Sequence, residues 1–198
     1  LPKCEDAPEL GADKILYNIS LFIDDLLFSF YKQEKFYNIK SEKDLIGHLV
    51  VALAPHTSAG TTARIIGFSK TQAFYAHPLM HAATRRDCDG DEASVALLMD
   101  VLLNFSRQFL PDSRGSTQDT PLILTSILNP TEVDDMVFDL DVMERYPLEF
   151  YEATLQYELP WNIKIDRFAN ILNSEGKYTK ISYTHPVGNI NAGVKCSS

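Results

Sequence analysis

The sequence predicts an α+β fold, a β-barrel with helices around it, and two patterns indicate this class. Short apolar runs bounded by turn residues are typical of buried strands, and they occur at residues 49–54, 64–68 and 121–128. Segments in which apolar residues recur every three or four positions are typical of helices, and they occur at residues 9–34 and 93–110. With 198 residues, the chain can bury one substantial core, or form one domain with a helical appendage.

The first third of the chain is predicted to contain a long helix and the first strand. The helix, residues 9–34, has apolar residues at helical spacing: Ile15, Ile19, Phe22, Leu26 and Phe30. Ser41 is predicted to cap a short helix that runs on through residues 45–49, with Asp44 in the capping-box position. The segment 55–60 has Pro at its start and Gly at its end, and it is predicted to be the turn between the first two strands.

The second half of the chain begins with the strongest helical pattern. Residues 93–110 place one apolar face at helical spacing and end before a proline; that face comprises Val95, Leu98, Leu102, Phe105 and Phe109. Residues 146–157 are predicted to be helical and residues 177–184 to form a late strand. The pattern over residues 132–143 does not separate helix from strand.

A short acidic stretch, residues 85–92, is the most informative part of the chain. Asp87, Asp89 and Asp91 alternate, so their carboxylates can point the same way from an extended or looped backbone. Gly90 lies among them, and a residue without Cβ lets the loop bend tightly. Clustered carboxylates repel one another unless a divalent cation neutralises them, and oxygen ligands suit Mg²⁺. The alternative is a solvated acidic turn at the start of the following helix, where the helix dipole favours negative charge.

A calcium-binding EF-hand does not fit this stretch. Counted from Asp87, the sixth position is Glu92 where that loop needs Gly, and the twelfth is Leu98 where it needs Glu. The following segment is also a continuous apolar pattern, which leaves no room for a twelve-residue calcium loop.

The stretch and its upstream context resemble the metal-binding signature of multisubunit RNA polymerases. His77-Pro78-Leu79 begins ten residues before Asp87, as in that signature, and Arg85 stands where that family has Asn. In those enzymes three aspartates of a double-psi β-barrel hold the catalytic Mg²⁺. This resemblance implies that Asp87, Asp89 and Asp91 occupy the same three positions.

A second resemblance covers nearly the whole chain. Blocks in the same order are similar to the large subunit of archaeal family-D DNA polymerase, at residues 22–27, 44–49, 54–60, 64–68, 76–78, 81–83, 85–92, 102–106, 146–152 and 189–193. Family-D enzymes usually have Asn at the position of Asp87, so this chain presents a third carboxylate.

The family-D resemblance implies a fold, an activity and a metal. The fold is a double-psi β-barrel of the two-barrel polymerase type with surrounding helices, in which residues 1–47 form a helical lead-in and residues 48–198 the catalytic barrel region, both as a piece of a larger subunit. The activity is that of a Mg²⁺-dependent DNA-directed DNA polymerase, in which Mn²⁺ is a possible substitute. The catalytic residues and metal ligands are then Asp87, Asp89 and Asp91.

Five further residues are predicted to contact nucleic acid or nucleotide: Arg85, Arg86, His81, His56 and Arg114. The guanidinium group suits bidentate contacts with phosphate. For the arginines beside the acidic stretch the alternative is pairing with local carboxylates, and for the histidines it is a structural role.

The partners that the family implies are primer–template DNA and deoxynucleoside triphosphates, the remainder of the large subunit, a small exonuclease subunit and a sliding clamp. The expected location is cytoplasmic, at the nucleoid, and no apolar run is long enough to span a membrane. The net charge of −9 opposes phosphate binding by this chain alone, so a basic groove would come from other portions of the subunit. Two alternative functions stay open: a two-barrel nucleotidyltransferase similar to RNA polymerase, and a non-catalytic acidic cation-binding or assembly module.

Overall fold

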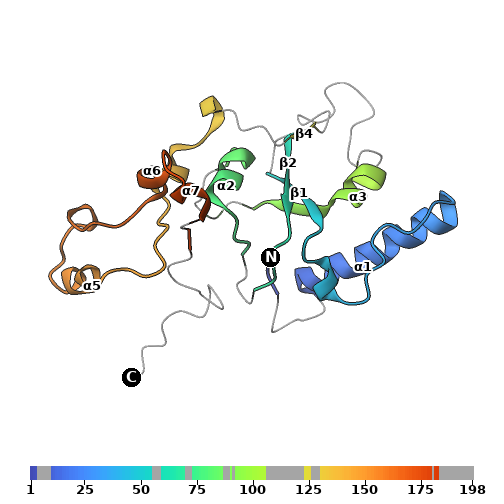
Figure 1. Cartoon of the computed structure of the whole chain (residues 1–198), viewed down its shortest axis with the longest axis horizontal. Coiled ribbons are helices and arrows are strands. Elements are labelled where there is room, and N and C mark those ends of the chain that lie inside the picture. The colour runs from blue at the N-terminus through green and yellow to red at the C-terminus, as the bar shows by residue number, and fades with distance from the viewer. Residues whose placement is uncertain are drawn as a thin grey trace.

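The protein is α+β, with short helices around one four-stranded sheet. The computed structural model describes residues 1–3, 10–54, 59–69, 73–86, 90, 92–105, 123–125, 130–179 and 181–182. These parts of the chain are drawn out along one axis, with α1 (Ala12–Asp25) toward one end and α5 (Leu148–Leu155) at the other (Figure 1). The sheet lies between them.

The sheet has the strand order β3-β1-β2-β4, with β1 (Leu49–Leu53), β2 (Ala59–Arg64), β3 (Ser94–Leu97) and β4 (Ile123–Thr125). Its central strand β1 is antiparallel to both neighbours, and its residue Val51 pairs with Thr62 of β2 and Ala96 of β3. The edge strand β4 runs parallel to β2. Strand β1 is buried over its three central residues, as its apolar run predicts.

The second strand begins and ends earlier than the prediction of residues 64–68. It is built from the small residues that precede the apolar run, because pairing with β1 places residues 61–64 in register. The apolar run itself divides: Ile65 is buried in the core, whereas Ile66 is exposed to solvent. The prediction placed the strand on the apolar run, whereas pairing with β1 ends at Arg64, before that run begins.

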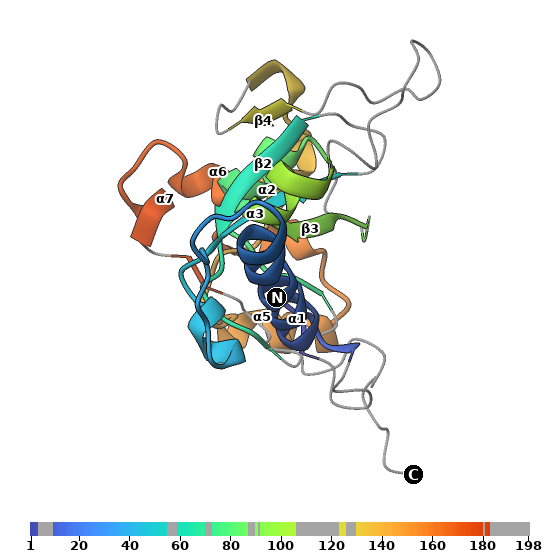
Figure 2. The ribbon, with the colours of Figure 1, turned by 90° about the vertical axis from the view of Figure 1, so that its right-hand side faces the viewer.

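The first helix forms where the sequence predicts it, but it buries a different face. Helix α1 continues into the π-helical turn η2 (Leu26–Phe30), and Leu16, Ile23 and Leu27 are buried. Phe22, which the predicted face includes, is 58% exposed. Apolar residues lie on more than one side of this helix, so its sequence pattern is compatible with burial of either of two faces. Contact with the sheet decides which face is buried. Figure 2, viewed from the α1 end, shows the helix in front of the sheet.

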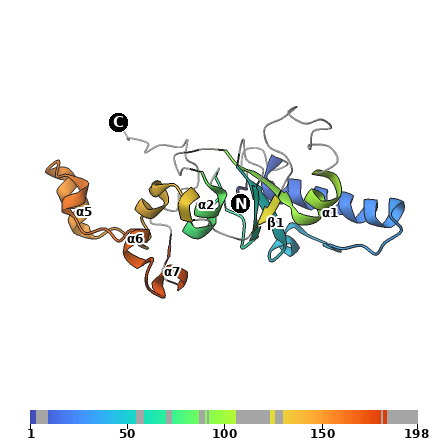
Figure 3. The same ribbon diagram turned by 90° about the horizontal axis from the view of Figure 1, so that it is seen from above.

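The remaining helices are short and are distributed along the chain (Figure 3). They are η3 (Glu42–Leu45), α2 (Pro78–Thr84), α3 (Leu98–Asp100), η4 (Val101–Phe105), η5 (Pro130–Glu132), η6 (Asp135–Asp139), η7 (Pro160–Asn162), α6 (Phe168–Ile171) and α7 (Gly176–Thr179). In η3, the carboxylate of Asp44 accepts a hydrogen bond from the Ser41 N–H at 2.9 Å, so the predicted cap at Ser41 is confirmed. The helix ends at Leu45, so the predicted continuation through residues 45–49 is wrong. The predicted helix at 146–157 is confirmed as α5.

Two further predicted elements differ from the structure. The predicted helix at 93–110 begins as strand β3 and becomes helical only at Leu98, because residues 94–97 complete the sheet along the free edge of β1. The predicted strand at 177–184 begins inside helix α7. Sequence alone favoured the helix because Val95 and Leu98 also satisfy a helical period.

Two hydrophobic clusters form the interior of the described part of the chain. The first joins α1 to the sheet and comprises Leu16, Ile23, Leu27, Tyr37, Ile39, Leu45, Val50, Ile65 and Leu97. The second lies around α2 and α6 and comprises Ala82, Val137, Val142 and Phe168. Helix α1 therefore shares one core with the strands.

A buried carboxylate organises the segment that follows α1. Asp24 accepts three backbone hydrogen bonds, from the N–H groups of Phe36 at 2.9 Å and of Tyr37 and Asn38 at 2.8 Å. These bonds direct Tyr37 into the first cluster, where burial raises the pKa of its phenol. The Tyr37 hydroxyl in turn accepts the Met99 N–H at 3.3 Å.

We expect Asp24→Asn to lower the free energy of unfolding by roughly 2–4 kcal/mol, because the amide leaves buried N–H groups without a charged acceptor. Asp25→Asn is the matched control: this exposed neighbour lies 3.9 Å from the Lys35 ammonium, and its loss should cost no more than about 0.5 kcal/mol. Urea unfolding followed by circular dichroism measures the free energy of unfolding of both variants. Equal losses in the two would contradict the stabilising role given to Asp24.

Candidate functional site

The acidic stretch follows helix α2, which is attached to strand β2. The hydroxyl of Thr61, in β2, donates to the carbonyl of Ala83 at 3.1 Å, and the hydroxyl of Thr84 donates to the carbonyl of His81 at 2.6 Å. Both threonines are buried. The helix ends at Arg85, which adopts the left-handed conformation with φ +60° and donates its N–H to the Ala82 carbonyl at 3.2 Å. The chain therefore leaves α2 by a sharp turn directly before the aspartates.

The other end of the stretch is attached to strand β1. Strand β3 begins at Ser94, opposite Leu53 of β1, so only a short connection separates the sheet from the last aspartate. Gly90 has φ +103°, a conformation that L side chains rarely adopt. Gly90 therefore adopts a backbone conformation that the absence of Cβ allows, as the sequence predicts.

The structure describes three of the predicted site residues. His81 lies on α2, Arg85 ends it and is exposed, and Arg86 follows and is half-buried. Asp87, Asp89, Asp91, His56 and Arg114 lie outside the described residues. Among the residues that are described, no group of three or more His, Cys, Asp or Glu could hold a metal ion.

His77 caps the N-terminus of α2 and joins it to a distant segment. Its Nδ1 accepts the Leu79 N–H at 3.1 Å, and its Nε2 lies 2.6 Å from the carbonyl oxygen of Lys177 in α7. A carbonyl only accepts, so the tautomer with its proton on Nε2 satisfies both contacts. The ring also packs edge-on against Phe168, with centroids 6.0 Å apart. His77 therefore fixes the start of α2 to α7 and to Phe168.

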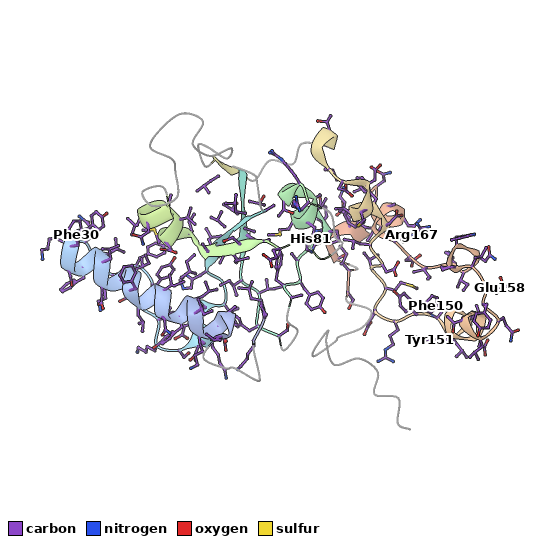
Figure 4. All side chains as sticks on the ribbon, turned by 180° about the vertical axis from the view of Figure 1, so that it is seen from behind. Phe30, His81, Phe150, Tyr151, Glu158 and Arg167 are labelled. Carbon is purple, nitrogen blue, oxygen red and sulfur yellow. The ribbon has the colours of Figure 1, made fainter. Side chains whose placement is uncertain are left out.

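His81 faces a different environment, on the same helix. Its ring stacks on Phe74 with centroids 5.8 Å apart and an interplanar angle of 21°. Burial, with a smaller contribution from His77, lowers the pKa of the imidazole below its usual value, so the ring is neutral at neutral pH. In Figure 4 His81 lies on α2 in the middle of the molecule, with Arg167 beyond it toward α5. A neutral imidazole can form a hydrogen bond or a stacking contact but carries no positive charge.

Three contacts that support the site were not predicted from sequence. They are made by the Thr61 hydroxyl, the Phe74 ring and the Lys177 carbonyl. The first two groups gave no signal because a threonine in a strand and an aromatic in a loop are ordinary residues. The third is a backbone group, one hundred residues away from its partner.

Comparison with known proteins places the chain in a family. Residues 8–198 match the family described as DNA polymerase II large subunit DP2, catalytic domain. The chain belongs to this family. It is 54% identical over 96% of its length to the DNA polymerase II large subunit of Archaeoglobus fulgidus, and 50% identical over 94% to those of Thermoplasma acidophilum and Methanococcus maripaludis strain C5.

The family resemblance predicted from sequence is therefore confirmed. The chain spans 17% of the length of the Archaeoglobus and Thermoplasma relatives and 16% of that of the Methanococcus relative. In the described parts of the chain, no helix is long and apolar enough to cross a membrane.

We expect His77→Phe to loosen the start of α2. Phenylalanine keeps the ring beside Phe168 but can neither accept from Leu79 nor donate to Lys177. The loss of an N-cap acceptor costs about 1 kcal/mol, so the Leu79 amide should exchange roughly five- to tenfold faster. Hydrogen exchange read by mass spectrometry or NMR measures this, with amides of β1 as internal control; unchanged exchange at Leu79 would refute the cap.

The lowered pKa of His81 predicts a pH dependence of stability. The unfolded chain binds a proton more tightly at this residue than the folded chain does. The contribution of His81 to the free energy of unfolding is therefore complete above the pKa that His81 has in the unfolded chain. It is lost as the pH falls through the pKa that His81 has in the folded chain. Urea midpoints measured between about pH 7 and pH 5 should fall less in His81→Phe than in the parent. Identical slopes in the two proteins would show that His81 does not titrate in this way.

Proposed function

We propose that this chain is the metal-holding part of a Mg²⁺-dependent DNA-directed DNA polymerase, the catalytic segment of an archaeal family-D large subunit. The observation that carries this proposal is the match of residues 8–198 to the catalytic domain of that subunit, with the three alternating aspartates inside it. The reaction is transfer of a deoxynucleotide to a primer 3′-hydroxyl, with release of pyrophosphate.

Asp87, Asp89 and Asp91 are the proposed metal ligands. Carboxylate oxygens are the donors that Mg²⁺ and Mn²⁺ prefer, so the chemistry of the donor set fits. The anchored ends of the stretch and the positive φ of Gly90 support a tight loop in which three charges need a cation. When bound, Mg²⁺ supplies Lewis-acid activation of the primer hydroxyl and neutralises charge on the triphosphate.

The protein's remaining task is to position the reactants. Arg85 is exposed directly before the aspartates, so its guanidinium can bind a phosphate of the primer or of the incoming nucleotide in bidentate fashion. We assign a similar phosphate-binding role to Arg86 and Arg114. His81 and His56 are proposed to contact nucleic acid, His81 as a neutral ring whose Phe74 stack orients it.

The proposed fold of the complete catalytic region is a double-psi β-barrel of the two-barrel polymerase type. The mixed sheet β3-β1-β2-β4, with the metal stretch entering β3, supplies strands for such a barrel. We propose residues 48–198 as the barrel region with inserted helices and residues 1–47 as its helical lead-in.

The proposed partners follow from membership of the family, and the charge of the chain indicates which part of the subunit would bind DNA. A net charge of −9 disfavours phosphate binding by this segment alone, so the basic groove for primer–template DNA would come from the remainder of the large subunit. A small exonuclease subunit and a sliding clamp complete the proposed assembly, which acts at the nucleoid. The same charge is what favours the alternative, a non-catalytic acidic cation-binding module.

Primer extension by the full large subunit, with its small subunit, tests the proposal. We expect Asp89→Asn combined with Asp91→Asn to lower Mg²⁺-dependent extension at least about 100-fold while DNA binding persists, because charge stabilisation of the transition state is lost. Asp135→Asn, which removes an exposed carboxylate in η6, is the matched control and should retain parental activity.

The nucleotide supplied separates the alternatives. Extension with deoxynucleotides that disappears in the double variant supports the DNA polymerase, whereas a preference for ribonucleotides supports an enzyme similar to RNA polymerase. Extension that survives the double substitution would make the acidic stretch structural or regulatory and would overturn the proposal.

A further inference from the structure

A protruding arm, residues 146–163, carries α5 and η7 away from the rest of the chain (Figures 1 and 3). Its base is closed by backbone hydrogen bonds from Val142 N–H to the Asp166 carbonyl at 3.1 Å and from Phe168 N–H to the Leu140 carbonyl at 2.9 Å. Val142 and Phe168 are both buried in the second cluster. The arm is therefore fixed to the core where it begins and ends.

The arm has internal order of its own. The Ala153 carbonyl, near the end of α5, accepts the N–H groups of Gln156 at 3.0 Å and Glu158 at 3.1 Å. The side-chain amide of Asn162 donates to the Glu158 carboxylate at 3.0 Å. At the start of the arm the rings of Tyr146 and Phe150 lie 4.5 Å apart. These contacts give the arm a defined surface.

That surface is apolar and uncovered in the described chain. Helix α5 contains no buried residue. Leu155 is 76% exposed, Trp161 72% and Tyr157 94%, and Leu148, Tyr151 and Leu159 are exposed with them. Tyr157 also has φ +55°, a strained conformation for a large side chain. A short helix without a buried face gains no packing energy, so this arrangement needs a covering partner.

We propose that the arm docks into an apolar groove with a basic rim on another segment of the same large-subunit polypeptide, outside these 198 residues. The arm contains Glu149, Glu152 and Glu158 and neither Lys nor Arg. Its charge is therefore complementary to a basic rim around the apolar contact. The chain spans 17% of the length of its relatives, so most of a related subunit lies outside the region described.

A segment of the same polypeptide has a large advantage over any separate molecule. Covalent tethering makes the contact intramolecular, so a modest apolar contact suffices to keep the arm covered. Nucleic acid is disfavoured because its phosphates would face three glutamates. A second copy is disfavoured because a symmetric contact would bring the same glutamates together. The inference depends on family membership and not on the proposed metal chemistry.

Site-specific photocrosslinking in the full large subunit, alone and with its small subunit, tests the inference. The photoreactive phenylalanine analogue benzoylphenylalanine is placed at Tyr157 or Leu155, and at the exposed Asn173 as control. We expect intrachain crosslinks from the two arm positions at least about tenfold above the control, because the arm would lie in a sustained intramolecular contact and Asn173 would not. Mass spectrometry should map them to one segment rich in apolar residues with Lys or Arg beside them.

A second variant distinguishes docking from chance proximity. Trp161→Glu adds charge to an exposed position, so it should leave circular dichroism and thermal unfolding of the subunit intact while lowering the Tyr157 crosslink several-fold. Crosslinks that run to the small subunit or to a second copy of the chain, or arm yields equal to those at Asn173, would overturn the proposal. Polymerase activity is not a readout, so failure here would leave the proposed function standing.

Discussion

The described structure depends on strand β1 being paired along both of its edges. Its neighbours are β2, which follows it in the chain, and β3, which follows the acidic stretch. Helix α2 is joined to β2 through Thr61, so the residues before the aspartates are attached to one neighbour of β1 and the residues after them become the other. Displacement of β1 would release both ends of the proposed metal loop at once.

A second constraint joins the loop to the far end of the chain. His77 connects the start of α2 to Lys177 and Phe168, which belong to the segment that also supports the arm. Helix α2, which precedes the proposed metal loop, and the base of the arm both pack in the second hydrophobic cluster. Where the arm contacts another part of the subunit, that core offers a physical route by which the contact and the site can influence each other.

The charge of the chain fits the proposed role of one segment within a larger polymerase subunit. The chain has a net charge of −9, and both its acidic stretch and its arm present carboxylates. A polymerase that binds a polyanion needs positive potential, and a metal site needs negative ligands. In the proposed function, these requirements are divided between segments of one long polypeptide, which would keep the carboxylates of the proposed metal site away from competing ammonium and guanidinium groups.

The sequence by itself determined those features that depend on local chemistry. Strand β1 and helix α5 follow from their apolar patterns, the Asp44 cap from side-chain reach, and the need for glycine at position 90 from the absence of Cβ. Family membership and the acidic stretch could also be predicted from the sequence, because the order of the motifs along the chain can be read without knowing the fold.

Tertiary structure decided the cases in which a local sequence pattern fits two different structures. Residues 94–97 satisfy a helical period, yet they form β3 because the edge of β1 offers hydrogen bonds that a helix start does not. Helix α1 has apolar residues on more than one side, and the sheet selects Leu16, Ile23 and Leu27 over Phe22. The contacts that support the site, from Thr61 to Ala83 and from His77 to Lys177, join groups distant in sequence, so only folding brings them within hydrogen-bonding distance.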